Sequence, residues 1–131
     1  PSNLSFEQAA AYPAVYATAH VALINRARLL SGETLLVLGA SGGVGMAALD
    51  VGRLLGARLI AGARGGAKRG ALLAYGADAV IDTAQPFRDQ IKALTEGRGA
   101  DVILDPVGGA GFEEATRCIA FGGRLLTAGF A

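Results

Sequence analysis

The sequence predicts an α/β fold in which one parallel sheet of five strands, in the order 3-2-1-4-5, carries helices on both faces. Short apolar runs alternate with helical patterns four times over residues 33–131. The runs are apolar on both faces, which is typical of parallel strands buried between two helical layers. Because crossover connections are right-handed, successive helices fall on opposite faces and the sheet is doubly wound.

Helices precede the alternating region. Residues 4–30 have a helical pattern, and Ser5 is a suitable N-cap for it. Pro13 lacks the backbone N–H that a helix interior requires, so we expect it to divide this region into a short helix and a longer one over residues 14–30. Ser31-Gly32 then provides the stop.

The strands and helices of the core, residues 33–131, follow in strict alternation. The predicted strands cover residues 35–38, 58–62, 79–82, 101–104 and 124–128. The helices between them cover residues 42–55, 68–75, 86–95 and 110–120. Gly56 and Gly76 end the first two of these helices, Pro86 suits a first helical turn, and Asp105-Pro106 ends the fourth strand.

Composition fits one domain and excludes several classes of protein. Of 131 residues, 52% are hydrophobic and 18% are charged, which is enough apolar material for one core. The net charge of +1, with scattered basic residues, argues against nucleic-acid and membrane partners. The single cysteine, Cys118, rules out an internal disulfide or a multi-cysteine zinc site and is compatible with the cytoplasm. The chain starts without Met and stops after the last strand, so we expect a piece of a longer protein.

A glycine-rich turn joins the first predicted strand of the core to its first helix. It matches A-x-G-x-x-G through Ala40, Gly42 and Gly45, and equally G-x-x-x-G-x-G through Gly39, Gly43 and Gly45. Both spacings let the backbone approach a pyrophosphate while the N–H groups of the helix N-terminus face its charge. Ser41 and Val44 belong to the same turn, and Ser41 adds a hydroxyl donor. The position between strand and helix favours a Rossmann-type dinucleotide site over a flavodoxin-like turn that binds nothing.

The end of the second strand indicates which dinucleotide binds. NAD-binding domains usually place an Asp or Glu there to bind the adenosine ribose. Here the position falls at Ala63 and Arg64, and no carboxylate occurs between Asp50 and Asp78. Arg64 and Lys68 instead supply positive charge suited to a 2′-phosphate. The sequence therefore favours NADPH over NADH, although a solvated basic helix start is the alternative.

Two later loops follow strands four and five, at the edge of the sheet where ligands bind in this architecture. The first contains Asp105, Val107 and Gly108, and the second contains Phe130. Both are expected to border the nicotinamide half of the cofactor. For Asp105, ordinary turn chemistry remains an open alternative.

Several segments together resemble the cofactor domain of the medium-chain dehydrogenase/reductase superfamily. Within the superfamily, they are similar to the zinc-independent quinone oxidoreductase (zeta-crystallin-like) branch. The segments that carry this resemblance are residues 4–10, Thr18-Ala19 and residues 32–45, 76–82, 105–109 and 122–126. The resemblance implies that Lys68 contacts the 2′-phosphate and that Thr18 lies near the nicotinamide. It also implies hydride transfer from NADPH to a small-molecule electron acceptor, either a quinone or an α,β-unsaturated carbonyl.

Members of this branch also have a GroES-like catalytic domain and a sixth strand, and we expect neither within this chain. The fifth strand is therefore expected at an exposed edge, where two copies of the chain pair as a homodimer. No residue is a convincing catalytic acid, because His20 and Cys118 are expected to be structural and no tyrosine has a lysine four residues later. Two alternatives stay open: a stand-alone NADPH-binding module, and an enoyl reductase domain of a fatty acid or polyketide synthase.

Overall fold

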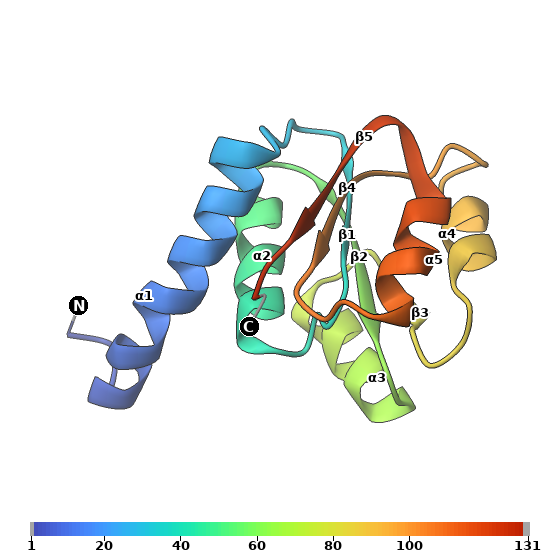
Figure 1. Ribbon diagram of the computed structural model, residues 1–131. Coiled ribbons are helices and arrows are strands. Elements are labelled where there is room, and N and C mark those ends of the chain that lie inside the picture. The colour runs from blue at the N-terminus through green and yellow to red at the C-terminus, as the bar shows by residue number, and fades with distance from the viewer. Residues whose placement is uncertain (1, 130–131) are drawn as a thin grey trace.

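The computed structural model describes residues 2–129 and shows the predicted architecture (Figure 1). Five parallel strands form one sheet in the order β3-β2-β1-β4-β5. The strands are β1 (Thr34–Val37), β2 (Arg58–Ala63), β3 (Ala79–Asp82), β4 (Ala100–Asp105) and β5 (Ile119–Thr127). The helices are α1 (Phe6–His20), the π-helical turn η1 (Val21–Arg26), α2 (Gly43–Leu54), α3 (Gly66–Tyr75), α4 (Arg88–Leu94) and α5 (Ala110–Cys118).

Strand β1 lies at the centre of the sheet and sets the position of the site. It pairs with β2 on one side and with β4 on the other, Leu36 lying opposite Ile60 and Ile103. The chain leaves β1 toward β2 and later returns to the other side of β1 through β4. In sheets of this kind ligands bind where the strand order reverses, at the carboxyl ends of the strands. Here that point lies between the ends of β1 and β4.

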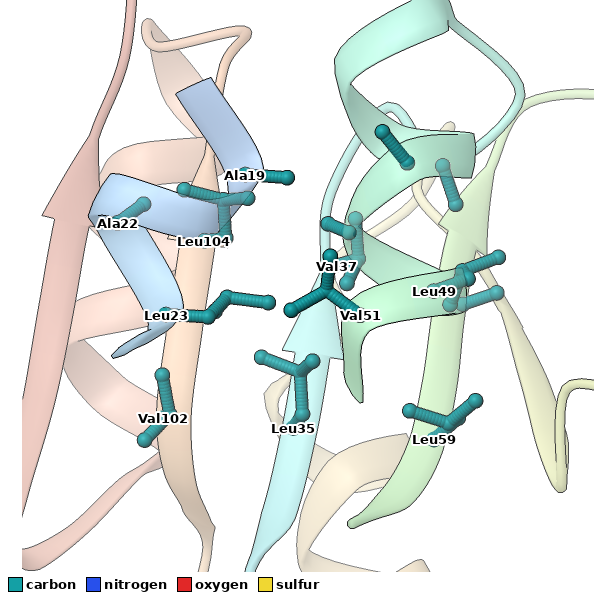
Figure 2. Packing of buried hydrophobic residues seen from close by; sticks show 14 of the residues in the cluster. Ala19, Ala22, Leu23, Leu35, Val37, Leu49, Val51, Leu59, Val102 and Leu104 are labelled. Carbon is teal, nitrogen blue, oxygen red and sulfur yellow. The ribbon is translucent and has the colours of Figure 1, made fainter. Parts of the chain in front are cut away.

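Two apolar clusters cover the two faces of the sheet. One cluster joins α1, η1, α2 and α3 to the side chains of β1, β2 and β4 that point toward them. Figure 2 shows Leu23, Val51 and Leu35 of this cluster packed together between helices and sheet. The other cluster joins α4 and α5 to the opposite face through residues such as Phe87 and Ile103. Strands buried on both faces explain the apolar runs in the sequence.

Helix α1 runs unbroken through Pro13, so the predicted division at this residue is wrong. Two contacts accompany the unbroken axis, one before the proline and one across it. Ser5 and Gln8 form a capping box, in which each side chain accepts the backbone N–H of the other, at 3.2 and 2.9 Å. The rings of Tyr12 and Tyr16 stack across one turn with their centroids 4.2 Å apart. The proline removes one internal hydrogen bond, and the helix tolerates that loss.

The helical region also ends earlier than residue 30. The turn η1 ends at Arg26, and Arg28 then adopts a left-handed conformation with φ of 49°. Arg124 of β5 binds this end of the helix, because its Nε donates to the carbonyl oxygen of Ala27 at 2.9 Å. The same guanidinium donates to both carboxylate oxygens of Glu33, at 2.8 and 2.7 Å. A long-range contact therefore binds the end of the helical region, which lies before Ser31-Gly32.

Strand β5 begins at Ile119, five residues before the predicted start, and α5 ends correspondingly at Cys118. The pairing of β4 with β5 is irregular here: β4 advances from Ala100 to Val102 while β5 advances from Ile119 to Arg124. The extra residues form a bulge within β5, with Gly122 at φ 72° and the Phe121 side chain fully exposed. As predicted, β5 lies at an edge of the sheet, with β4 as its neighbour. Within residues 2–129, every helix is too short or too polar to cross a lipid bilayer.

Candidate functional site

The glycine-rich turn lies at the carboxyl end of β1 and leads directly into α2. Its shape comes from backbone hydrogen bonds: the N–H of Ala40 donates to the Gly62 carbonyl of β2, and the N–H of Gly42 donates to the Gly39 carbonyl, both at 3.0 Å. Gly39 has φ of 58°, which favours glycine. Gly42 is the N-cap of α2 and offers no side chain to its first turn. The turn therefore needs no side chain to hold its conformation.

Close packing explains two further glycines of the turn. A Cβ on Gly45 would lie 2.5 Å from the Gly39 carbonyl oxygen and 2.6 Å from the Ala40 Cα. A Cβ on Gly43 would lie 2.9 Å from Val15 Cγ1 of α1. Glycine at these positions lets α2 begin against the end of β1, as the third glycine of dinucleotide-binding turns does.

The first turn of α2 has the chemistry of an anion site. Among residues 2–129, the backbone N–H groups of Gly43, Val44 and Gly45 donate to no acceptor. Ser41, Gly42 and Gly43 are exposed, so the start of the helix is accessible. Free N–H groups and the positive end of the helix dipole favour a phosphate at this position.

A pocket of about 560 Å³ opens beside the turn, between the loops that follow β1, β2, β3 and β4. The structure brings six of the predicted site residues together in its lining: Ser41, Ala63, Arg64, Lys68, Val107 and Gly108. Ala40, Gly42, Gly43, Val44 and Gly45 form the adjoining turn and do not line the pocket. Phe130 lies outside the described residues.

The basic residues after β2 differ in whether they form an ion pair. Arg69 is engaged, because its Nη2 lies 3.7 Å from Asp82 Oδ2 at the end of β3. The side chains of Arg64 and Lys68 are exposed at the pocket and make no hydrogen bond or ion pair with any described residue. Two cations thus remain available to a ligand in the pocket.

One wall of the pocket is formed by the loop of residues 83–87 after β3, and two side chains fix it. Gln90 accepts the N–H of Asp82 at 3.2 Å and donates to the carbonyl oxygens of Asp82 and Pro86. Glu114 of α5 accepts the N–H groups of Phe87 and Arg88 at 3.0 and 3.1 Å. The wall is therefore held in place without a ligand.

Asp105 is buried at the end of β4, beneath the loop of residues 106–109. Its Oδ1 accepts the N–H groups of Val107 and Gly108 at 2.9 and 2.8 Å. These bonds hold the two residues against the pocket, and the Val107 Cγ2 lies 2.7 Å from where a Cβ on Gly39 would be. The other oxygen, Oδ2, is buried without a hydrogen-bond partner among residues 2–129. Turn chemistry therefore accounts for one carboxylate oxygen of Asp105.

A cluster of polar side chains links α1, α2 and α3 on one face of the sheet. Tyr16 of α1 and Tyr75 of α3 both donate hydrogen bonds to the carboxylate of Asp50 on α2, the latter at 2.7 Å. The bond to Asp50 raises the pKa of Tyr16 to about 12 and also raises that of Tyr75. Arg53 completes the cluster, 3.3 Å from Asp50 Oδ1. Neither phenol is suited to donating a proton near neutral pH.

Three residues considered in the sequence analysis lie away from the pocket. Thr18 of α1 is half-buried and donates to the Ala14 carbonyl at 2.8 Å. Cys118 is buried, as predicted, and burial raises the pKa of its thiol to about 11. His20 is exposed at the end of α1. Among residues 2–129, no three His, Cys, Asp or Glu side chains are grouped to hold a metal ion.

Sequence reasoning missed part of the pocket. It did not single out the residues of the loop after β3 or Glu113 of α5, which also line the cavity. It also missed that Asp82, although distant in sequence from Ala63, stands opposite it in the sheet. The strand order 3-2-1-4-5 was the available signal, because it places the end of β3 beside the end of β2.

Comparison with known proteins identifies the family. Residues 43–131 match the family described as zinc-binding dehydrogenase. The chain belongs to this zinc-binding dehydrogenase family. The resemblance to the medium-chain dehydrogenase/reductases is thereby confirmed, and the members of this family are oxidoreductases.

Individual relatives agree with the family. The chain is 42% identical to a quinone oxidoreductase-like protein 2 homolog of Nematostella vectensis, covering 100% of this chain and 36% of the relative. It matches the structure of an NAD-dependent alcohol dehydrogenase with a TM-score of 0.93 and 37% identity, covering 97% of this chain and 37% of the other. The CurK enoyl reductase structure matches with a TM-score of 0.92 and 30% identity, covering 97% and 38%. The chain thus spans little more than a third of these proteins.

Proposed function

We propose that this chain binds NADPH as the cofactor domain of an enzyme. The enzyme would transfer hydride to a quinone or an α,β-unsaturated carbonyl. Although the family is described as zinc-binding, we propose that this enzyme does not use zinc. The pocket beside the glycine-rich turn carries this proposal, because Arg64 and Lys68 line it without a partner among the described residues. The first turn of α2 would bind the pyrophosphate, and the two cations the 2′-phosphate. Bound NADPH would supply the hydride, and this chain would bind and orient it.

Two features support NADPH over NADH. The carboxylate usual at the end of the second strand is absent, since Ala63 and Arg64 occupy this position. The nearest carboxylate on the neighbouring strand, Asp82, is paired with Arg69. Negative charge at the adenosine end of the pocket is therefore partly neutralised, which favours a phosphorylated ribose.

The proposed electron acceptor rests on similarity to known proteins and not on the residues of the pocket. The quinone oxidoreductase-like relative supports a quinone, while the CurK structure supports the alternative of an enoyl reductase domain. Both reactions would use the same cofactor-binding domain. A quinone acceptor would be a small molecule.

The substitution Lys68→Ala tests the cofactor assignment. It removes one charge-assisted contact with the 2′-phosphate, so we expect NADPH to bind about 10- to 150-fold more weakly while NADH affinity is unchanged. Both affinities are measured by nicotinamide fluorescence during titration.

Lys92→Ala is the matched control, because Lys92 lies on α4 away from the pocket and donates to the Gly97 carbonyl. It should leave both affinities unchanged. Equal affinity of the unmodified chain for NADPH and NADH would contradict the assignment.

A further inference from the structure

The pocket has two sides of opposite charge. Arg64 and Lys68 line it on the side of β2 and α3, and Glu113 lines it on the side of α5. The Glu113 side chain is exposed and makes no hydrogen bond or ion pair with residues 2–129. A ligand that matches this pocket carries negative charge at one end and a hydrogen-bond donor at the other.

The second carboxylate of the pocket, Glu114, is already engaged. One of its oxygens accepts the N–H groups of Phe87 and Arg88, and the other lies 3.1 Å from Arg117 Nη1. Among the described lining residues, Glu113 is therefore the carboxylate left free to accept from a ligand.

Apolar groups complete the lining of the pocket. Leu38, Pro86 and Phe87 contribute to the lining there. Because Gln90 and Glu114 fix the loop that carries Pro86 and Phe87, this surface is preformed. It suits a flat aromatic ring, whose faces are apolar and whose edge is polar.

We propose that Glu113 accepts a hydrogen bond from the exocyclic 6-amino group of adenine and so selects adenine as the base of the cofactor. This inference rests on the proposed function. The 2′-phosphate and the base are attached to the same ribose, so a phosphate bound by Arg64 and Lys68 brings the base into the same pocket. The 6-amino group is the only N–H donor of the adenine ring in a nucleotide, and an ionised carboxylate is an acceptor only.

Adenosine 2′,5′-bisphosphate and its analogue with hydrogen in place of the 6-amino group test this proposal by calorimetry. The unmodified chain is expected to bind the adenine compound about tenfold more tightly, the low end for a hydrogen bond to a charged group. Glu113→Ala removes the acceptor and should bring the ratio of the two affinities close to one. Glu113→Gln retains a neutral acceptor oxygen and should give an intermediate ratio.

Asp89→Asn is the matched control for the loss of one negative charge, because Asp89 is exposed on α4 and does not line the pocket. It should preserve the full ratio. An unchanged ratio in Glu113→Ala, or no preference in the unmodified chain, would overturn the role of Glu113 alone. If adenosine 2′,5′-bisphosphate fails to bind, or binds no better than adenosine 5′-phosphate, the proposed NADPH site fails as well.

Discussion

Asp105 is the residue at which two interpretations of the sequence meet. Its Oδ1 organises the loop by accepting two backbone N–H groups, which is the ordinary behaviour of an Asp at a turn. Those same bonds hold Val107 and Gly108 in the lining of the pocket. The turn chemistry and the site are thus the same structure. The sequence could predict the loop but not the burial of the second oxygen, which depends on the assembled fold.

Gly45 is the most constrained position of the glycine-rich turn. Gly45→Ala would place a methyl group 2.5 Å from the Gly39 carbonyl oxygen, a contact with backbone that no side-chain rotation relieves. We expect the free energy of unfolding to fall by about 1–3 kcal/mol, as in other overpacked sites. We also expect NADPH affinity to fall, because the start of α2 must move away from β1. Urea unfolding and NADPH titration measure the two effects.

The matched control for this substitution is Gly70→Ala in α3. A Cβ on Gly70 would meet nothing within 4 Å, and its φ is not positive. Alanine should stabilise this exposed helical site by up to about 1 kcal/mol. If both alanine variants behave alike, the close approach of α2 to β1 does not determine the stability of the turn.

The pair of Glu33 and Arg124 makes a pH-dependent contribution to stability. Arg124, which donates to both Glu33 oxygens, lowers the pKa of Glu33 below its usual value of 4.5. The contribution of the pair to stability is therefore complete above pH 4.5. It is lost as the pH falls through the lowered pKa of Glu33 in the folded state. We expect Glu33→Gln to reduce the free energy of unfolding by about 1–2 kcal/mol at pH 7, since the pair is bidentate but partly exposed.

Denaturant unfolding between pH 3 and pH 7 measures this contribution. The difference between the unmodified chain and Glu33→Gln should shrink below pH 4.5. Asp89→Asn is the control, because Asp89 is almost fully exposed and 4.0 Å from Arg88. A difference for Glu33→Gln that is constant over this pH range would show that the ion pair is not its cause.

At the scale of elements, local signals predicted where segments lie better than where they end. The bounds of β3 were predicted exactly as residues 79–82, and Gly76 ends α3 in the left-handed conformation expected of a C-cap. The early end of the first helical region was not predictable, because Arg124 binds it from 97 residues away in sequence. The unbroken helix at Pro13 was not predicted, because the general rule for proline takes no account of the capping box before it or of the Tyr12–Tyr16 stack across it.

At the scale of the whole molecule, the strand order followed from the alternation of strands and helices and from the handedness of crossovers. The glycine-rich turn and Arg64 could be located from the sequence because each follows a strand directly, and Lys68 because it lies in the first turn of the next helix. The wall after β3 and Glu113 could not, since their relation to the cations depends on the assembled sheet. The pocket is therefore a property of the fold more than of any single motif.

The exposed edge of the sheet leads to a prediction about assembly. Strand β5 has β4 on one side, and no other described strand pairs with its outer edge. Since an unprotected edge can pair with another strand, we propose that two copies of the chain associate through β5. Light scattering should then show a mass that rises with concentration toward that of a dimer.

Thr127→Lys should weaken this association, because Thr127 is exposed near the end of β5 and a charge on an edge strand opposes pairing. A monomeric mass at all concentrations would contradict the dimer. So would a dimer that the lysine leaves unaffected, since it would have to form through another surface.

The bulge at the start of β5 has a practical consequence. Ile119–Gly123 projects at the opposite end of the sheet from the glycine-rich turn, with an exposed aromatic side chain at Phe121 and a glycine beside it (Figure 1). Exposed loop tips are where proteases cut and where inserted sequence is tolerated. The tip of this bulge, at Phe121 and Gly122, is exposed in the same way, and it is the place to attach a fluorescent label, far from the glycine-rich turn.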